Sequence, residues 1–363
     1  MPRAFMSFAA LIFVSPAAAA AIAPVEVVRT GAAFAPISGA LSPVFPEHSL
    51  SGLPSALMPA LPAPPVAPLA AAAPIDRTSE RFLQLHRDVR EDLAGPLPAA
   101  AKSYRYYFVP GFTANHISGY MAENVERLKA LGLDADRLSI ATEGDRNGSL
   151  AAIGRAVAAS PKPVILIGHS LGGMHIHDWY RLAPDGLKAK TAGLILMQTP
   201  IGGSPVADAW MEHWFTRAFA RFMSLLPTWG NGLETMQEMT VSARRQVLAG
   251  LPRLTLRDMG KILILQGSFD PAVNGRYHRD MKPLWKVFED RRHELSDGVV
   301  GVGESVIPGA RTVRVDDLDH EDAVLQDTGW IKWLMGSRPN PKYRPGDITE
   351  ALVRFFFRGR RRL

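Results

Sequence analysis

The chain has 363 residues, of which 47% are hydrophobic, and this is enough to form a sizeable buried core. It contains no cysteine, which excludes a small scaffold held together by disulfides. The formal net charge is +6, but no nucleic-acid-binding module accompanies it, so we expect no nucleic-acid partner.

The first 23 residues have the order of a secretory signal. Arg3 is followed by an apolar stretch from Ala4 to Val14 and then by small residues with an Ala-x-Ala pattern. We therefore expect residues 1–23 to be a signal peptide and the protein to be secreted or periplasmic; an uncleaved anchor is the alternative. No later stretch has the roughly 18 consecutive apolar residues of a membrane-spanning helix, so the mature protein is expected to be soluble or peripheral.

Residues 24–75 are rich in alanine, proline and serine and carry few charges. Proline at this density blocks regular elements, which predicts a disordered linker or a pro-region. Order is expected to begin near Asp76, because Phe82, Leu85 and Val89 follow at helical spacing. We place the folded domain at residues 76–347.

Within this domain, short apolar or β-branched runs alternate with longer helical stretches. Apolar runs of this length are typical of strands covered on both faces, and the intervening segments are long enough for crossover helices. The pattern predicts an α/β fold with a doubly wound, mostly parallel sheet. The predicted strands are 104–110, 137–142, 163–168, 192–198, 261–267 and 311–317.

A long insertion at about residues 203–258 contains aromatic residues at helical spacing. Such a stripe is compatible with a mobile lid over an apolar acyl pocket, or with a cap helix packed permanently on the core. The stripe consists of Trp210, Trp214, Phe215, Phe219, Phe222 and Met223.

The C-terminal residues 348–363 combine arginines with three consecutive phenylalanines. A basic, aromatic tail of this kind is suited to peripheral contact with an anionic membrane. A solvated tail is the simpler alternative.

The segment "PVILIGHSLGG" places Ser170 in a G-x-S-x-G pattern, after an apolar run and before a predicted helix. A serine on such a strand-to-helix turn is a nucleophile held in a strained conformation, and the small Gly168 and Gly172 leave room for the sharp elbow. The alternative is a serine that only caps the helix.

A serine nucleophile needs a base, and that base needs an orienting carboxylate. His320 lies just past the last predicted strand, where this chain order places the base; a surface histidine is the alternative. His169 flanks the nucleophile, His175 and His177 lie on the following helix, and His278 and His293 lie in charged segments expected to be exposed.

Two aspartates are candidates for the acid. Asp297 precedes a glycine that permits a tight turn, and Asp270 follows a predicted strand. Asp297 is favoured and Asp270 is the alternative; an Asx turn would explain either. Asp316, Asp317 and Asp319 are too close to His320 in sequence to orient it.

An oxyanion formed by attack on a carbonyl needs two backbone donors. We expect one to be the amide of Leu171, directly after the nucleophile. The second is expected from Phe112 in "VPGFTANH", although Phe112 is also suited to be a core aromatic.

From about Tyr104 to Val324, the chain resembles the α/β-hydrolase superfamily, and more closely the bacterial secreted lipases and serine esterases. The segments "VPGFTAN", "GHSLGG", "TPIGGSPVADAW", "ETMQEMTVSARRQVLAGLP", "SDGVV" and "DLDH" carry this resemblance in the same order. It implies a triad of Ser170, Asp297 and His320. Where the family has His-Gly before the oxyanion residue, this chain has Pro110-Gly111. Asp322 occupies the place of a family calcium ligand, but no convincing second ligand is found, so no metal is expected.

These patterns together indicate a serine hydrolase that cleaves carboxylic esters of lipid-like chemistry through an acyl-enzyme, without a cofactor. An acyltransferase would use the same residues. A hydrolase-like module that binds a lipid or a protein without turnover is the alternative from another functional class.

Overall fold

The computed structural model describes residues 76–212, 232–326 and 338–358. The predicted signal peptide and linker lie outside these residues. None of the helices in the described ranges is long and apolar enough to cross a membrane.

In chain order the described elements are α2 (Arg77–Arg90), η2 (Ala99–Ser103), β1 (Arg105–Val109), η3 (Ala114–His116), α3 (Ala122–Ala130), β2 (Asp134–Arg137), α4 (Arg146–Ala159), β3 (Val164–His169), α5 (Leu171–Leu182), α6 (Asp185–Lys190), β4 (Thr191–Met197), α7 (Pro205–Glu212), α9 (Gly232–Glu238), α10 (Val241–Gly250), α11 (Leu256–Met259), β5 (Ile262–Ser268), α12 (Pro271–Asn274), α13 (Lys282–Arg292), β6 (Arg311–Asp316) and α15 (Pro345–Arg358).

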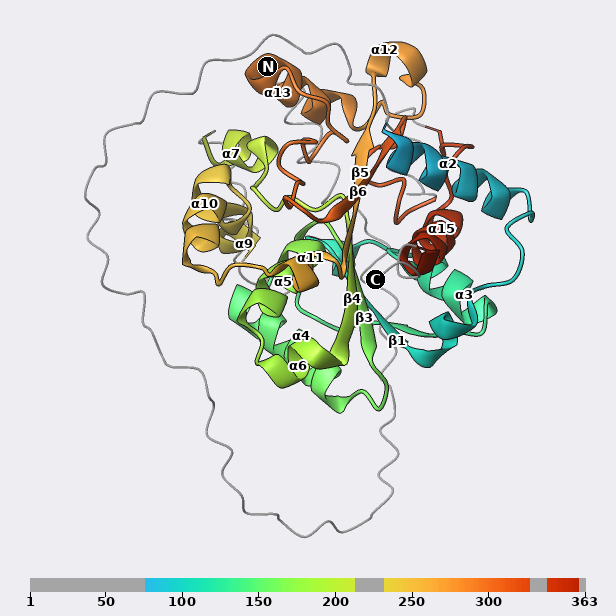
Figure 1. Ribbon diagram of the computed structural model, residues 1–363. Coiled ribbons are helices and arrows are strands. Elements are labelled where there is room, and N and C mark those ends of the chain that lie inside the picture. Colours follow the sequence, from blue (N-terminus) through green and yellow to red (C-terminus); the bar gives the residue numbers. More distant parts are fainter. Residues whose placement is uncertain (1–75, 213–231, 327–337, 359–363) are drawn as a thin grey trace, which may run out of the picture. The chain divides into compact units, whose positions relative to one another are not determined.

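The strands form one parallel sheet of six strands in the order β2-β1-β3-β4-β5-β6. Helices cover both faces, as in a doubly wound α/β fold (Figure 1). Because all strands run in the same direction, their carboxyl ends meet at one edge of the sheet, where ligands bind in such folds. The fold class predicted from the sequence is therefore confirmed.

Alternating side chains of each strand enter two hydrophobic clusters on opposite faces of the sheet. On β3, Ile165 and Ile167 face a cluster that includes residues of α2, α3 and α15. Val164 and Leu166 face the other cluster, which includes residues of α4 and α5. This two-sided burial explains why the central strands are continuous apolar runs in the sequence.

The second strand lies earlier than predicted. It spans Asp134–Arg137, whereas the sequence analysis placed it at 137–142. The reason is that β2 is the edge strand: Asp134 and Asp136 form ion pairs with Arg105 on β1, so the strand is polar, with only Ala135 fully buried. The apolar residues that suggested the later position lie in the following loop.

The predicted first helix is confirmed as α2. Asp76 caps it, since its carboxylate accepts the backbone N–H of Ser79 at 2.7 Å. Phe82, Leu85 and Val89 are buried, as their helical spacing predicted.

The prediction of a basic, aromatic tail at residues 348–363 is wrong for residues 348–358, the part that the structure describes. Residues Pro345–Arg358 form α15, which packs against α2 and α3, and Phe356 and Phe357 are buried in the core. The helix forms because its apolar residues recur on one face, and Arg354 is neutralised by Glu350 one turn before it. These phenylalanines are therefore not available as a membrane-binding aromatic tail; residues 359–363 lie outside the described part.

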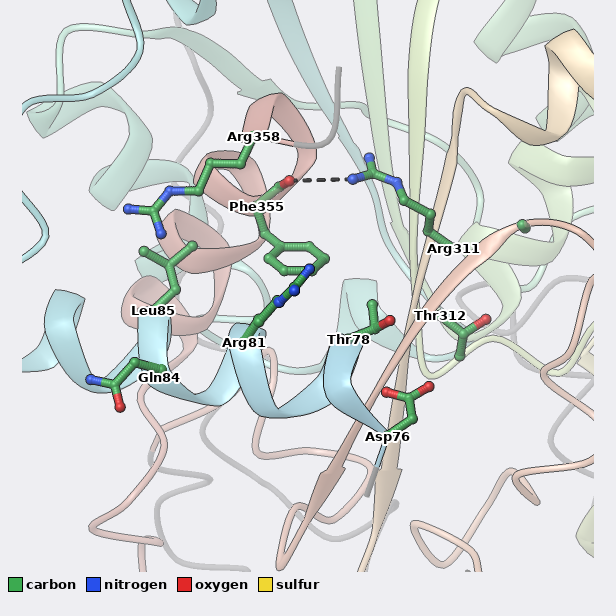
Figure 2. A pocket seen from close by; sticks show the side chains of 10 residues that line it. Asp76, Thr78, Arg81, Gln84, Leu85, Arg311, Thr312, Phe355 and Arg358 are labelled. Atoms are coloured by element: carbon green, nitrogen blue, oxygen red, sulfur yellow. Dashed lines mark hydrogen bonds between the residues drawn. The ribbon is translucent and has the colours of Figure 1, made fainter. Parts of the chain in front are cut away.

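A groove of about 800 Å³ lies between α2, the start of β6 and α15 (Figure 2). Arg311 on β6 donates hydrogen bonds to the backbone oxygens of Phe355 and Phe356 at the end of α15. This contact ties the last helix to β6, which is the edge strand at the other side of the sheet from β2. Since Arg311 is the first residue of β6, the groove lies at the amino ends of the strands, opposite the edge expected to carry the site.

The predicted insertion begins with α7 and continues with α9, α10 and α11. Of the aromatic stripe, only Trp210 belongs to the described residues, where it is partly buried on α7. The distinction between a lid and a fixed cap therefore stays a hypothesis for residues 213–231.

A buried ion pair joins this insertion to the helix after the nucleophile turn. Arg244 on α10 is fully buried and donates two hydrogen bonds, at 2.7 and 2.9 Å, to the carboxylate of Asp178 on α5. Burial alone would raise the pKa of Asp178, but hydrogen bonds from His177 and Arg244 outweigh it and lower that pKa.

We expect Arg244→Met to lower the free energy of unfolding by about 2 kcal/mol. Asp178 would keep its charge in the core, with Arg146 and His177 as its remaining partners. The neighbouring Arg245 is exposed, and Arg245→Met is the matched control, with an expected change within about 0.5 kcal/mol. Urea unfolding of both variants measures this. Equal stability of the two variants would show that the pair does not hold α10 in place.

Candidate active site

Ser170 occupies the sharp turn between β3 and α5. Its backbone has φ 52° and ψ −125°, and its side chain makes no capping hydrogen bond to α5. Its N–H donates to the backbone oxygen of Met197, which fixes the turn to β4. A strained residue whose hydroxyl does not serve the helix has the features of a nucleophile and not those of a helix cap.

Close backbone packing explains the glycines around Ser170. A Cβ on Gly168 would lie 2.6 Å from the Cα of Gly173, and a Cβ on Gly172 would overlap the backbone oxygens of Val109 and Pro110. Larger residues at either position would push β3, α5 and the end of β1 apart. The elbow therefore needs glycine at Gly168 and Gly172, as the motif predicted.

His320 lies in the loop after β6 and faces Asp297. The distance from His320 Nδ1 to Asp297 Oδ2 is 2.9 Å, and the backbone N–H of His320 donates to the backbone oxygen of Asp297 at 2.9 Å. The other carboxylate oxygen of Asp297 accepts the backbone N–H groups of Val299 and Val300, and Gly298 has φ 95°. Asp297 thus makes an Asx-type turn and contacts His320 at the same time.

The alternative acid, Asp270, has a different contact. It is exposed, and its carboxylate accepts the N–H of Ala272 at the start of α12. Of the two aspartates, the geometry brings Asp297 to the histidine and leaves Asp270 as a helix cap.

The nucleophile turn and the histidine loop are in direct contact. His169, the residue before Ser170, lies with its Nε2 2.9 Å from the backbone oxygen of His320, and the two rings are 4.6 Å apart. Among the described residues, the Ser170 side chain makes no hydrogen bond, to His320 or to any other group. Such bonds are often long in unliganded hydrolases and tighten when substrate binds.

The loop after β1 lies beside the same turn. A Cβ on Gly111 would be 3.1 Å from the Cβ of Ser170, so Gly111 lies directly beside the nucleophile turn. Phe112 is the next residue in the chain after Gly111. Leu171 is the first residue of α5, and its N–H therefore has no acceptor within the helix. The two predicted oxyanion donors thus belong to the two segments that border Ser170.

His278 is buried, which contradicts the prediction that its segment is exposed. Its side chain is 0% exposed and lies between Asp319 and Asp317, at 2.8 and 3.1 Å. Burial alone would lower the pKa of His278, but the two carboxylates outweigh it and raise the pKa to about 9. A protonated His278 therefore holds the loop that carries His320.

The same cluster bears on the calcium site that the family resemblance suggested. His278, Asp319 and Asp322 have ligand atoms within 4.8 Å of one another. Calcium, however, takes six to eight oxygen ligands, and here one of the three groups is an imidazole, whose Nδ1 forms a hydrogen bond with Asp319 at 2.8 Å. These residues fit a histidine cation better than a calcium ion.

The raised pKa of His278 predicts a pH-dependent stability. A folded-state pKa above the unfolded value of 6.5 stabilises the fold fully below pH 6.5, and this contribution is lost as the pH rises through about 9. The expected loss is about 3 kcal/mol. It is measured by urea unfolding from pH 6 to 10, and His278→Asn should remove it.

His293 supplies the control for this measurement, because it is exposed at the end of α13. His293→Asn should keep the pH dependence of the wild type. A wild-type curve parallel to that of His278→Asn would contradict the charged state assigned to His278.

A sequence model of the alpha/beta hydrolase family matches residues 107–329, which is more than half of the chain and includes Ser170, Asp297 and His320. The chain belongs to the alpha/beta hydrolase family. A search of curated proteins found no match.

Several solved structures described as esterases or lipases are similar to this chain. A metagenomic carboxyl esterase is 20% identical with a TM-score of 0.65, over 82% of this chain and 96% of its own. A lipase of Staphylococcus hyicus is 13% identical with a TM-score of 0.48, over 73% of this chain and 98% of its own. The mature lipase BlEst2 of Bacillus licheniformis is 16% identical with a TM-score of 0.46, over 61% and 86%. The similarity to the esterase shows that the two chains share a fold.

Sequence reasoning missed three residues that the hydrolase fold gathers around His320. His169 was visible beside the nucleophile but was considered only as a base. Tyr120 and Gln198 carry no recognisable motif, and only the structure brings them to this site.

Proposed function

We propose that the protein is a serine hydrolase that cleaves carboxylic esters. Ser170 attacks the carbonyl carbon, His320 accepts the proton of its hydroxyl, and Asp297 orients His320 and stabilises its cationic form. The amides of Phe112 and Leu171 stabilise the oxyanion of the tetrahedral intermediate. The observation that carries the proposal is the strained Ser170 turn in contact with a histidine loop whose imidazole is paired with a buried aspartate.

The reaction proceeds in two halves. The Ser170 oxygen forms a bond to the acyl carbon, and the alcohol leaves with the proton that His320 returns to it. Water then attacks the acyl-enzyme, gives its proton to His320, and releases the acid as Ser170 recovers that proton. No cofactor takes part in these steps.

We further propose a lipid-like acyl chain as the substrate class and a mobile lid in the insertion. Support comes from the apolar character of the predicted stripe. Trp210, its described member, packs with α13 residues at the start of the insertion, which a lid in its closed position and a fixed cap share. Structural neighbours described as lipases and esterases are consistent with this chemistry.

A series of p-nitrophenyl esters from acetyl to palmitoyl tests the proposal, with Ser170→Ala as the blank. A maximum at long acyl chains supports the lipid-like substrate, and a maximum at acetyl argues for a small-ester esterase. Wild-type protein that neither hydrolyses any ester nor reacts with a fluorophosphonate probe would instead be a binding module.

We also propose export, from the predicted signal peptide alone. Expression of the full chain in a Gram-negative host should yield a periplasmic or secreted form cleaved a few residues before Pro24, because a proline directly after the cleavage site is unfavourable. Mass spectrometry of intact cytoplasmic protein with Arg3 retained would contradict this.

A further inference from the structure

We infer that Tyr120 and His169 are positioning residues for the catalytic base, an inference that rests on the function proposed above. They form a hydrogen-bonded chain that ends on the backbone of His320. The Tyr120 hydroxyl is 2.5 Å from His169 Nδ1, and His169 Nε2 is 2.9 Å from the His320 carbonyl oxygen. Both side chains are buried, with residue exposures of 8% and 1%.

The direction of each hydrogen bond follows from the chemistry of the groups. A backbone carbonyl oxygen can only accept, so His169 Nε2 carries a hydrogen. Burial, and next the neighbouring His320, hold the pKa of His169 well below its usual value, which leaves the ring neutral. Its Nδ1 therefore has a free lone pair and accepts the O–H of Tyr120, whose pKa burial raises so that it stays protonated.

The chain also reaches the loop expected to hold the oxyanion. A Cβ on Gly111 would lie 2.6 Å from the Tyr120 oxygen, so this hydroxyl packs closely against the backbone of Gly111. One side chain thus contacts the oxyanion loop, and through His169 it contacts the base. Because His169 precedes Ser170 directly, the three parts of the site are linked over a short distance.

His169 holds the backbone carbonyl of His320, which Asp297 does not contact. Asp297 accepts hydrogen bonds from the ring Nδ1 and from the backbone N–H of His320, while His169 donates to the carbonyl oxygen of His320. Gln198 acts in parallel, since its side-chain N–H donates to the preceding carbonyl of Asp319 at 2.7 Å. A displacement of about 1 Å at a catalytic group is enough to cost about 100-fold in rate.

The neutral state of His169 is part of the same role. Its ring lies 4.6 Å from that of His320, which becomes a cation when it takes the Ser170 proton. A second cation at this distance would oppose that step, whereas a neutral ring with a polarised N–H does not. A donor without charge is therefore suited to this position.

The test compares variants that remove one link each. Tyr120→Phe deletes only the hydroxyl, and we expect kcat for a p-nitrophenyl ester to fall about tenfold with KM within twofold. His169→Leu removes both hydrogen bonds and should lower kcat about 100-fold. In His169→Gln, the amide can donate to His320 and accept from Tyr120, so kcat should recover to within about fivefold of the wild type.

A double-mutant cycle and a matched control separate positioning from general stability. Tyr120→Phe combined with His169→Leu should be within about threefold of His169→Leu alone, because the tyrosine reaches the base through the histidine and only its contact with Gly111 is independent of it. Tyr106 is also buried and donates its O–H to a backbone oxygen, that of Ala101 at 2.8 Å, at the opposite end of β1. Tyr106→Phe should lose comparable stability in urea unfolding and keep the wild-type kcat.

Each outcome decides the inference. Wild-type kcat in Tyr120→Phe and His169→Leu, or an equal loss of kcat in Tyr106→Phe, would overturn it while wild-type ester hydrolysis upholds the proposed function. Poor folding of His169→Leu leaves Tyr120→Phe and His169→Gln to decide. A wild type without hydrolysis and without fluorophosphonate labelling would overturn the proposed function and this inference together.

Discussion

Substitution of Ser170 by alanine is expected to lower kcat for ester hydrolysis about a millionfold, to the rate that binding and the oxyanion donors alone provide. In the proposed mechanism the hydroxyl forms the acyl-enzyme, and no other described side chain occupies a strained elbow at the end of β3. Initial rates with a p-nitrophenyl ester, together with the loss of fluorophosphonate labelling, measure the effect.

Ser149 provides the matched control for this substitution. It is a buried serine on α4 whose hydroxyl has no hydrogen-bond partner. Ser149→Ala should keep both the activity and the labelling of the wild type. If Ser170→Ala kept more than about one per cent of the activity, another group would have to attack the ester.

Replacement of Asp297 by asparagine is expected to lower kcat about ten-thousandfold. The amide keeps the shape of the carboxylate, but it can present an N–H to His320 Nδ1 and does not stabilise the imidazolium. In the structure, this carboxylate is 1% exposed and 2.9 Å from the ring, so little solvent screens the lost charge. The change is measured as the pH dependence of kcat of the purified variants. Circular dichroism first confirms that the variants are folded like the wild type.

Asp270→Asn is the comparison that decides between the two candidate acids. Its carboxylate is exposed and caps α12, so its loss should leave kcat within about twofold and cost at most a small amount of stability. A large loss of kcat in Asp270→Asn together with near-normal activity in Asp297→Asn would reverse the assignment.

The choice between these acids illustrates what sequence patterns can supply. Both aspartates follow a predicted strand or precede a glycine, and both do make the Asx or cap contacts that such positions favour. Only the fold of the loop before β6 brings one of them to His320. The local pattern favoured Asp297 with Asp270 as the alternative, and the family resemblance was a further reason to prefer Asp297.

The C-terminal helix and His278 also show that a local sequence pattern does not decide whether a charged residue is buried. Arginines around Phe355–Phe357 suggested an exposed tail, yet Glu350 and the backbone oxygen of Ala94 accept hydrogen bonds from Arg354 and allow α15 to pack into the core. His278 lies in a charged segment, yet two aspartates about forty residues later make its burial favourable. Buried charges depend on partners that are distant in the chain, so local hydropathy predicts them poorly.

By itself, the sequence determined the parallel sheet, the elbow at Ser170 and the position of His320, because each depends on a local pattern: an apolar run of strand length, small residues around a sharp turn, and the order of elements along the chain. The tertiary structure decided where the polar edge strand β2 lies, that α15 is a core helix, that Asp297 is the aspartate that contacts His320, and that Tyr120 and His169 connect the loops around the site. These features depend on hydrogen bonds and ion pairs between residues far apart in the chain. Such contacts exist only after the hydrophobic core has brought those segments together.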